Sequence, residues 1–212
     1  MIPLQQLERQ NQEYCIMLFL SQLQLVVFDL DFCVWKPEMY QIQGPPILTP
    51  MKTFEKKKRK AKTQPSSLQL TPTSKKGMTV TDRAGTPITV FDGASFALSE
   101  INKMKKQDNN IQTAVASSTD KPPWARQCLE WMLVEDGSTL ASCFDYTEIR
   151  FGDKQRHFES LNRISGIPFE NMCFFDDTHS NILSVSQLGV KCVHTPKGVT
   201  RDAWKKALDM FD

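Results

Sequence analysis

The chain has 212 residues, 40% of them hydrophobic, which suffices for one α/β domain with a buried core. Its 26 basic and 24 acidic residues give a formal net charge of +2, too small to indicate a nucleic-acid partner. Six cysteines without a CxxC pair argue against a zinc or dithiol motif, and no apolar run reaches the roughly 18 residues of a membrane span. We therefore expect a protein of the cytoplasm, with the nucleus as the alternative, that has no contact with a membrane.

Residues 1–22 form an N-terminal extension rich in Gln, Glu and Leu, to which we assign no chemistry. The domain proper, residues 23–212, opens with the apolar run 25–28 and then Asp29. An apolar, β-branched run that ends at an acidic residue is typical of a buried parallel strand whose carboxyl end lies at an active site. Asp31 follows after a single residue, so the turn that leaves the strand can direct both carboxylates toward one cavity.

Residues 50–77 differ in composition from the rest of the domain. They contain the basic run 56–60 and few large apolar side chains, which predicts a disordered, basic insertion within the domain. A solvated linker is the simpler interpretation. A nuclear-import signal or a polyanion-binding patch is the alternative.

After the insertion, the runs 78–80 and 88–90 flank Asp82-Arg83-Ala84-Gly85 and predict a short β-hairpin, in which Gly85 adopts a positive φ. Further strands are predicted over 111–116, 143–149, 172–175 and 190–194, and helices over 94–106, 122–134, 154–165, 181–188 and 201–210. Alternation of this kind predicts an α/β fold of Rossmann-like type, with a central parallel sheet and helices on both faces. Ligands of such folds bind at the carboxyl ends of the strands.

Several polar residues lie at or just after the predicted strand ends. Besides Asp29 and Asp31, they are Ser117, Lys154 and the pair Asp176-Asp177. Taken singly, each is more often a helix cap, a turn residue or a solvated lysine. Their common placement in the fold instead indicates one site.

This set of residues suits phosphoryl transfer. Asp29 would attack phosphorus to form an acyl phosphate, while Asp31 would protonate the leaving oxygen. Positive charge is then needed against the phosphoryl oxygens, and Mg²⁺ and Lys154 can supply it. For the metal, Asp29 and Asp177 are candidate direct ligands. Ser117 is a candidate for binding a phosphoryl oxygen, and Asp176 would support the metal ligands or position Lys154.

The segment Phe28-Asp29-Leu30-Asp31, with Trp35 four residues further on, resembles the first motif of the magnesium-dependent phosphatase-1 family, which belongs to the haloacid dehalogenase (HAD) superfamily. The similarity covers about residues 24–212 apart from the basic insertion. It continues through the segments 114–119, 151–154, 157–159, 166–169, 174–177, 181–182 and 188–190.

The resemblance implies a three-layer HAD fold with a minimal cap, for which the 80–90 hairpin would stand in. It implies that Asp29 is both nucleophile and metal ligand, and that Asp31 is the general acid and base and binds the metal through its main-chain carbonyl. Asp177 would be the remaining ligand of the Mg²⁺ cofactor. Ser117 and Lys154 would hold phosphate, with Ser118 as a further phosphate-binding candidate.

Two positions depart from the family pattern. Ser118 stands where an arginine is common, so a bidentate phosphate or substrate contact is lost and the substrate preference is open to change. Cys33 stands where a threonine or a similar residue is usual. We expect Cys33 to be a packing residue near the site, since no histidine base accompanies it in the sequence.

Three functions remain open from the sequence. The first is a Mg²⁺-dependent phosphomonoesterase that acts through an aspartyl-phosphate intermediate, on small phosphorylated metabolites such as sugar phosphates or on phosphotyrosine in proteins. The second is a protein-serine phosphatase of the type that acts on the polymerase C-terminal tail. The third is a non-catalytic HAD-fold binding protein that uses the basic insertion. Oligomeric state cannot be deduced from the sequence.

Overall fold

The computed structural model describes residues 22–50, 78–107 and 110–211. The predicted extension 1–22 lies outside the described residues apart from residue 22, and the predicted insertion 50–77 apart from residue 50. Within the described part, no helix is long and apolar enough to cross a membrane.

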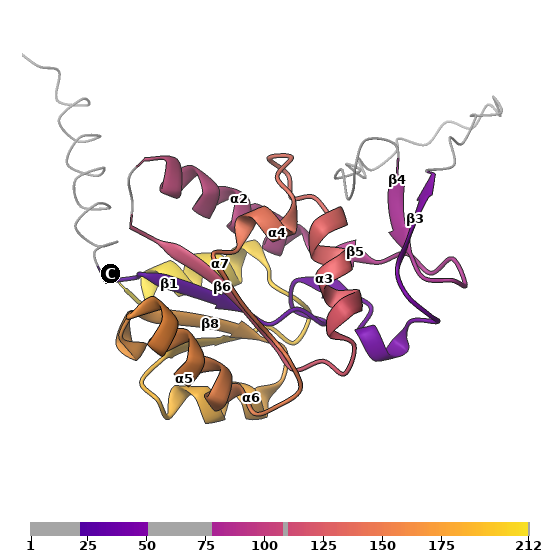
Figure 1. Ribbon diagram of the computed structural model, residues 1–212. Coiled ribbons are helices and arrows are strands. Elements are labelled where there is room, and N and C mark those ends of the chain that lie inside the picture. The colour runs from indigo at the N-terminus through magenta and orange to yellow at the C-terminus, as the bar shows by residue number, and fades with distance from the viewer. Residues whose placement is uncertain (1–21, 51–77, 108–109, 212) are drawn as a thin grey trace, which may run out of the picture.

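A five-stranded parallel sheet with the order β7-β6-β1-β8-β9 forms the centre of the domain (Figure 1). Its strands are β1 (Leu25–Phe28), β6 (Gln112–Ser117), β7 (Tyr146–Ile149), β8 (Met172–Asp176) and β9 (Lys191–His194). The central strand β1 pairs with β6 and β8, so that Phe28 lies between Val115 and Phe175. Because all five strands run parallel, their carboxyl ends lie at one edge of the sheet.

Helices cover both faces of this sheet (Figure 1). One face carries α5 (Lys154–Ser165) and α6 (His179–Ser186), and the other carries α2 (Asp92–Lys106), α3 (Pro122–Trp131), α4 (Leu140–Cys143) and α7 (Arg201–Asp209). Side chains of β1 alternate between two hydrophobic clusters, Leu25 and Val27 facing α5, and Val26 and Phe28 facing α2 and α7. This period of two in a strand buried on both sides explains its unbroken apolar run. The predicted three-layer Rossmann-like fold is confirmed.

The predicted hairpin forms around its turn, where Ile88 donates its N–H to Val80 O over 2.9 Å and Thr81 forms an antiparallel bridge with Pro87, but its two strands pair more extensively with other segments. Asp82 donates its N–H to Thr86 O over 2.9 Å, and Gly85 has φ +87°. However, β4 (Met78–Thr81) pairs antiparallel with β3 (Ile47–Pro50), and β5 (Thr89–Val90) pairs with β2 (Trp35–Lys36). Local β-propensity marks a segment as extended but cannot identify a partner more than 25 residues upstream.

Other predicted boundaries shift by small amounts, with one larger change. Helix α5 has the predicted bounds and ends at Gly166, which has φ +72°. The segment 143–149, in contrast, is not one strand, because Leu140–Cys143 is a helical turn and β7 begins at Tyr146. Thr139 caps that turn by accepting a hydrogen bond from Ser142 N.

The cysteines in the described part are free thiols, as expected. Four of them are buried: Cys33, Cys128, Cys143 and Cys173. Burial and the nearby carboxylates of Asp29 and Asp176 raise the pKa of Cys33 well above its ordinary value. Its thiol donates to the carbonyl of Phe175 over 3.3 Å, which agrees with a packing role near the site.

Candidate active site

A tight turn after β1 presents the two aspartates of the first motif. The Leu30 carbonyl accepts hydrogen bonds from the N–H groups of Cys33, Val34 and Trp35, and Phe32 adopts a left-handed φ of 55°. A non-glycine residue in this region costs free energy, which the surrounding contacts have to offset. The turn brings the indole of Trp35 back to Asp31, with 2.7 Å between Nε1 and Oδ1.

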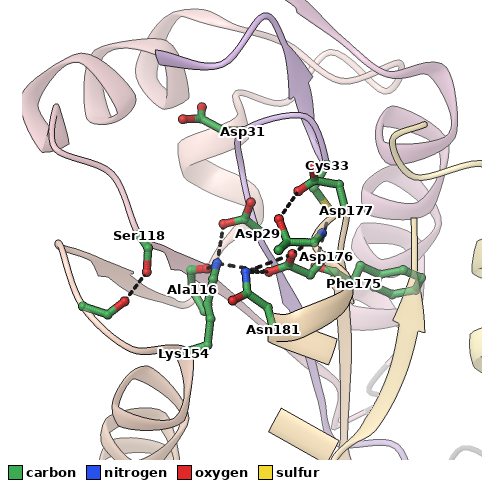
Figure 2. Close-up of polar contacts among 12 residues, drawn as sticks. Asp29, Asp31, Cys33, Ala116, Ser118, Lys154, Phe175, Asp176, Asp177 and Asn181 are labelled. Atoms are coloured by element: carbon green, nitrogen blue, oxygen red, sulfur yellow. Dashed lines mark hydrogen bonds and ion pairs between the residues drawn. The ribbon is translucent and has the colours of Figure 1, made fainter. Parts of the chain in front are cut away.

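Asp29 is buried and bound to Lys154. The Lys154 ammonium lies 2.5 Å from Asp29 Oδ1 and 2.5 Å from the carbonyl oxygen of Ala116, and 3.2 Å from Asp176 Oδ2 (Figure 2). Burial disfavours the charge of Lys154, but the two carboxylates outweigh this effect and raise its pKa. A buried cation thus stands between strands β1, β6 and β8.

The pKa of Asp29 is raised to about 7, chiefly by burial and also by the charges of Asp176 and Asp31, although Lys154 opposes the shift. Three neighbouring carboxylates with one ammonium leave an excess of negative charge. A bound cation would remove this excess and lower the pKa of Asp29.

The residues Asp29, Asp176 and Asp177 form one acidic group, with ligand oxygens within 4.8 Å of one another. Asp176 is fully buried and accepts hydrogen bonds from Thr178 N and from the Asn181 amide (Figure 2). Asp177 is half-buried, and burial and the charge of Asp176 raise its pKa. Clustered carboxylate oxygens beside open solvent suit a hard cation such as Mg²⁺, which keeps several waters. Asp176, for which the sequence predicts a supporting role, contacts Lys154 over 3.2 Å and also belongs to this acidic group.

Asp31 lies apart from this acidic group (Figure 2). Its second oxygen accepts a hydrogen bond from Met39 N over 3.1 Å. Burial raises the pKa of Asp31 to about 6, against the hydrogen bonds from Met39 and Trp35, which favour the ionised form. A carboxyl group that is fixed in orientation and titrates near neutrality can both donate and accept a proton at neutral pH.

An open cavity of about 260 Å³ joins these residues at the carboxyl ends of the strands. Asp29, Asp31, Ser117, Ser118, Lys154 and Asp177 all line it. The fully buried Asp176 does not line the cavity but contacts Lys154, so the structure brings together every predicted site residue. The Ser118 hydroxyl donates a hydrogen bond to the carbonyl of Gly152 over 2.5 Å. The Ser118 side chain therefore ties together the loops that follow β6 and β7.

The sequence analysis missed six lining residues: Glu38, Tyr40, Thr119, Asp120, Thr178 and Asn181. Asn181 follows Asp176 by five residues, and the segments of similarity 174–177 and 181–182 contain these two residues, so their spacing was a usable signal. Glu38 and Tyr40 belong to the loop around the short 3₁₀ helix η1 (Met39–Gln41), which carries no local signal of proximity to the site. In the described part, the predicted hairpin contributes no residue to the lining of this cavity, whereas the loop around η1 contributes Glu38 and Tyr40.

Comparisons with known proteins agree with this geometry. The family model described as Acid Phosphatase matches residues 21–212. The chain belongs to this family. It is 31% identical over 187 residues to magnesium-dependent phosphatase 1 of Homo sapiens, a match that covers 88% of this chain and 86% of the human protein. The predicted family and superfamily are confirmed.

One further relative and one solved structure extend the comparison. A HAD-like hydrolase superfamily protein, P8B7.31, of Schizosaccharomyces pombe is 31% identical over 168 residues, which are 78% of this chain and 81% of that protein. A crystal structure of the N-terminal part of BF1531 from Bacteroides fragilis, which contains a phosphatase domain complexed with Mg, aligns with a TM-score of 0.54 at 14% identity. That alignment covers 90% of this chain and 41% of the other chain, and it supports the fold of this acid phosphatase family member.

Proposed function

We propose that this chain is a Mg²⁺-dependent phosphomonoesterase that works through an aspartyl-phosphate intermediate on Asp29. The observation that carries the proposal is the contact of Asp29 with Lys154 inside the acidic group that Asp29 forms with Asp176 and Asp177. The relationship to a human protein named magnesium-dependent phosphatase 1 supports the same metal. When bound, Mg²⁺ supplies positive charge against the phosphoryl oxygens.

In the first step, a carboxylate oxygen of Asp29 attacks phosphorus and the bond from phosphorus to the leaving oxygen breaks. The leaving oxygen keeps the electron pair and takes a proton from Asp31. Lys154 keeps the Asp29 carboxylate oriented and, together with the Ser117 hydroxyl, neutralises and binds the phosphoryl oxygens.

In the second step, water attacks phosphorus of the aspartyl phosphate and gives one proton to Asp31. The bond between phosphorus and the Asp29 oxygen breaks, which releases inorganic phosphate and restores the carboxylate. The separate position of Asp31, held by Trp35 and Met39, suits a group that serves the leaving oxygen first and water afterwards.

The substrates that we propose are small phosphorylated metabolites such as sugar phosphates, or phosphotyrosine in proteins. An open cavity of about 260 Å³ admits a phosphoryl group and its immediate attachment without enclosing the rest of the molecule. Both classes therefore meet the same steric requirement.

Hydrolysis of 4-nitrophenyl phosphate tests the proposal. We expect turnover with Mg²⁺, none with excess EDTA, and at least a 10³-fold loss in Asp29→Asn, which retains the shape of the side chain but not its nucleophilic oxygen pair. Quenching a reaction with a ³²P-labelled ester in acid should leave label on the wild-type protein and none on the variant. Metal-independent turnover, or equal rates for the two proteins, would contradict the proposal and favour a binding protein.

A further inference from the structure

The cavity wall carries a large excess of negative charge. Its carboxylates are Asp29, Asp31, Glu38, Asp120 and Asp177, and Lys154 is its one ammonium group among the described residues. A bound divalent cation and a phosphoryl dianion cancel each other in formal charge. The excess of negative charge therefore remains when substrate is bound. It comes from the carboxylates that line the cavity, of which Glu38 and Asp120 form the rim.

Glu38 is the rim carboxylate with the least compensation. It precedes η1, is partly exposed, and forms no ion pair with any residue of the described part. Glu38 lines the same cavity as Asp31, which follows β1, and Asp177, which follows β8. The field of Glu38 thus extends across the mouth of the cavity.

Asp120 is the second rim carboxylate, but its surroundings differ. The ammonium of Lys121 lies 2.9 Å from Asp120 Oδ2, and the Asp120 side chain is 57% exposed. A neighbouring cation and solvent both weaken the field of an exposed carboxylate. Of the two rim groups, Glu38 therefore acts more strongly on a bound molecule.

We propose that Glu38 is a specificity-determining residue that repels a second anionic group on the substrate. The site then selects phosphomonoesters whose remaining part is neutral or cationic, and rejects those with a carboxylate or a further phosphate near the ester. This inference rests on the proposed function, since it concerns the selectivity of the same site. The lining residues of the described part include no arginine, so no guanidinium of the cavity wall receives a second anion.

A matched series of phenyl phosphates tests the inference. The para substituent is aminoethyl, carbamoylethyl or carboxyethyl, so that charge changes from cation to neutral to anion while the reactivity of the phosphate ester stays similar. At saturating Mg²⁺ and low ionic strength, we expect kcat/KM to decrease in that order, by about tenfold from cation to anion. In 0.5 M NaCl the ratio should contract to about twofold, because exposed charges are screened.

Three variants, each lacking one negative charge, locate the effect. Glu38→Gln should reduce the cation-to-anion ratio by about threefold, and Asp120→Asn by less than twofold. Glu170→Gln is the control, because Glu170 lies in η2 (Phe169–Asn171), which precedes β8 and so lies at the opposite end of the sheet from the cavity. It should leave the ratio unchanged, although the net charge of the protein changes equally.

The outcomes separate this inference from the proposed function. If the neutral ester is hydrolysed but the anionic ester is hydrolysed equally well, the rim inference is wrong and the phosphatase proposal stands. Equal effects of Glu38→Gln and Glu170→Gln would assign the selectivity to net charge and also overturn the inference. Absence of turnover for all three esters would instead count against the phosphatase proposal itself.

Discussion

The inner part of the site and its rim are built in different ways. In the inner part, Lys154 and Asp176 are buried, and each makes several hydrogen bonds or ion pairs with neighbouring segments of the fold. At the rim, Glu38 and Tyr40 come from one short loop, and Tyr40 is 68% exposed. A buried network tolerates little change because each lost partner leaves an uncompensated group, whereas an exposed side chain can be replaced at small cost. We therefore expect substitutions in the inner part to affect catalysis and stability, and substitutions at the rim to affect substrate choice.

Lys154→Met should give the largest effect and tests the inner part directly. The substitution leaves Asp29 and Asp176 buried without their cation, so kcat should fall by about 10²- to 10³-fold. In EDTA, the free energy of unfolding should fall by about 3 kcal/mol, since a buried charge network loses its central partner. Urea unfolding and steady-state kinetics measure the two quantities. Lys205→Met, at an exposed position of α7, should change neither, and similar behaviour of the two variants would contradict the assignment.

Asp31→Asn should lower the rate of hydrolysis by a factor that depends on the leaving group. The Asn amide cannot donate a proton and regain it, so transfer to a basic leaving oxygen should slow by about 10²-fold. Single-turnover rates with phenyl phosphate should show this loss, while 4-nitrophenyl phosphate, whose leaving oxygen needs less protonation, should be affected less. Equal losses for both esters would indicate that Asp31 acts only through structure.

The buried His157 leads to a further prediction for the inner part, which concerns the pH dependence of stability. Neither ring nitrogen makes a hydrogen bond of good geometry within the described residues. Burial, followed by the charges of Lys154 and Arg150, lowers the pKa of His157 to about 4, while Glu148 and the backbone of Arg150 oppose the shift. The unfolded chain therefore binds the proton first as the pH falls. The stability associated with neutral His157 is fully present above about pH 6.5 and is lost as the pH falls toward 4.

His157→Leu should remove about 2 kcal/mol of this pH dependence between pH 6.5 and 4. Urea unfolding at several pH values measures the slope, and carboxylates common to both proteins cancel in the comparison. The exposed His179 provides the control, since His179→Gln should retain the wild-type slope. A wild-type slope in His157→Leu would show that the fold accommodates the protonated ring.

The smallest effect is expected from removal of residues 52–76. Pro50 is paired with Met78 in the β3–β4 register, so the deletion leaves Met51 and Gly77 as a two-residue loop between adjacent strands. With Met51→Asn, this loop becomes Asn-Gly, which favours the type I′ turn of a tight hairpin. Turnover of 4-nitrophenyl phosphate should stay within about twofold of the full chain. A large loss of activity would show that the basic segment forms part of the site. It would contradict the view that the site consists only of the inner part and the rim described above.

Much of the inner part was accessible from the sequence because each residue is tied to a strand end or a helix start. Asp29, Ser117 and Asp177 follow apolar runs that are long enough to be recognised as strands, and Lys154 begins a helix that has a clear stop at Gly166. The Ser118 hydrogen bond to Gly152 was not accessible, since it joins two loops more than 30 residues apart. Glu38 was missed for the same reason, because its distance from Asp177 depends on the path of an irregular loop.

The sequence by itself determined the order of the five strands of the central sheet and of the longer helices, the polar residues at the ends of β1, β6 and β8, and the family of the protein, because hydrophobic periodicity and short motifs are local properties. Only the tertiary structure decided that β3 pairs with β4, that Asp176 joins Asp29 and Asp177 in one acidic group, and that Glu38 lies at the cavity. These contacts join segments distant in the chain, and their formation depends on how the packed layers position loops that have no periodic pattern of their own.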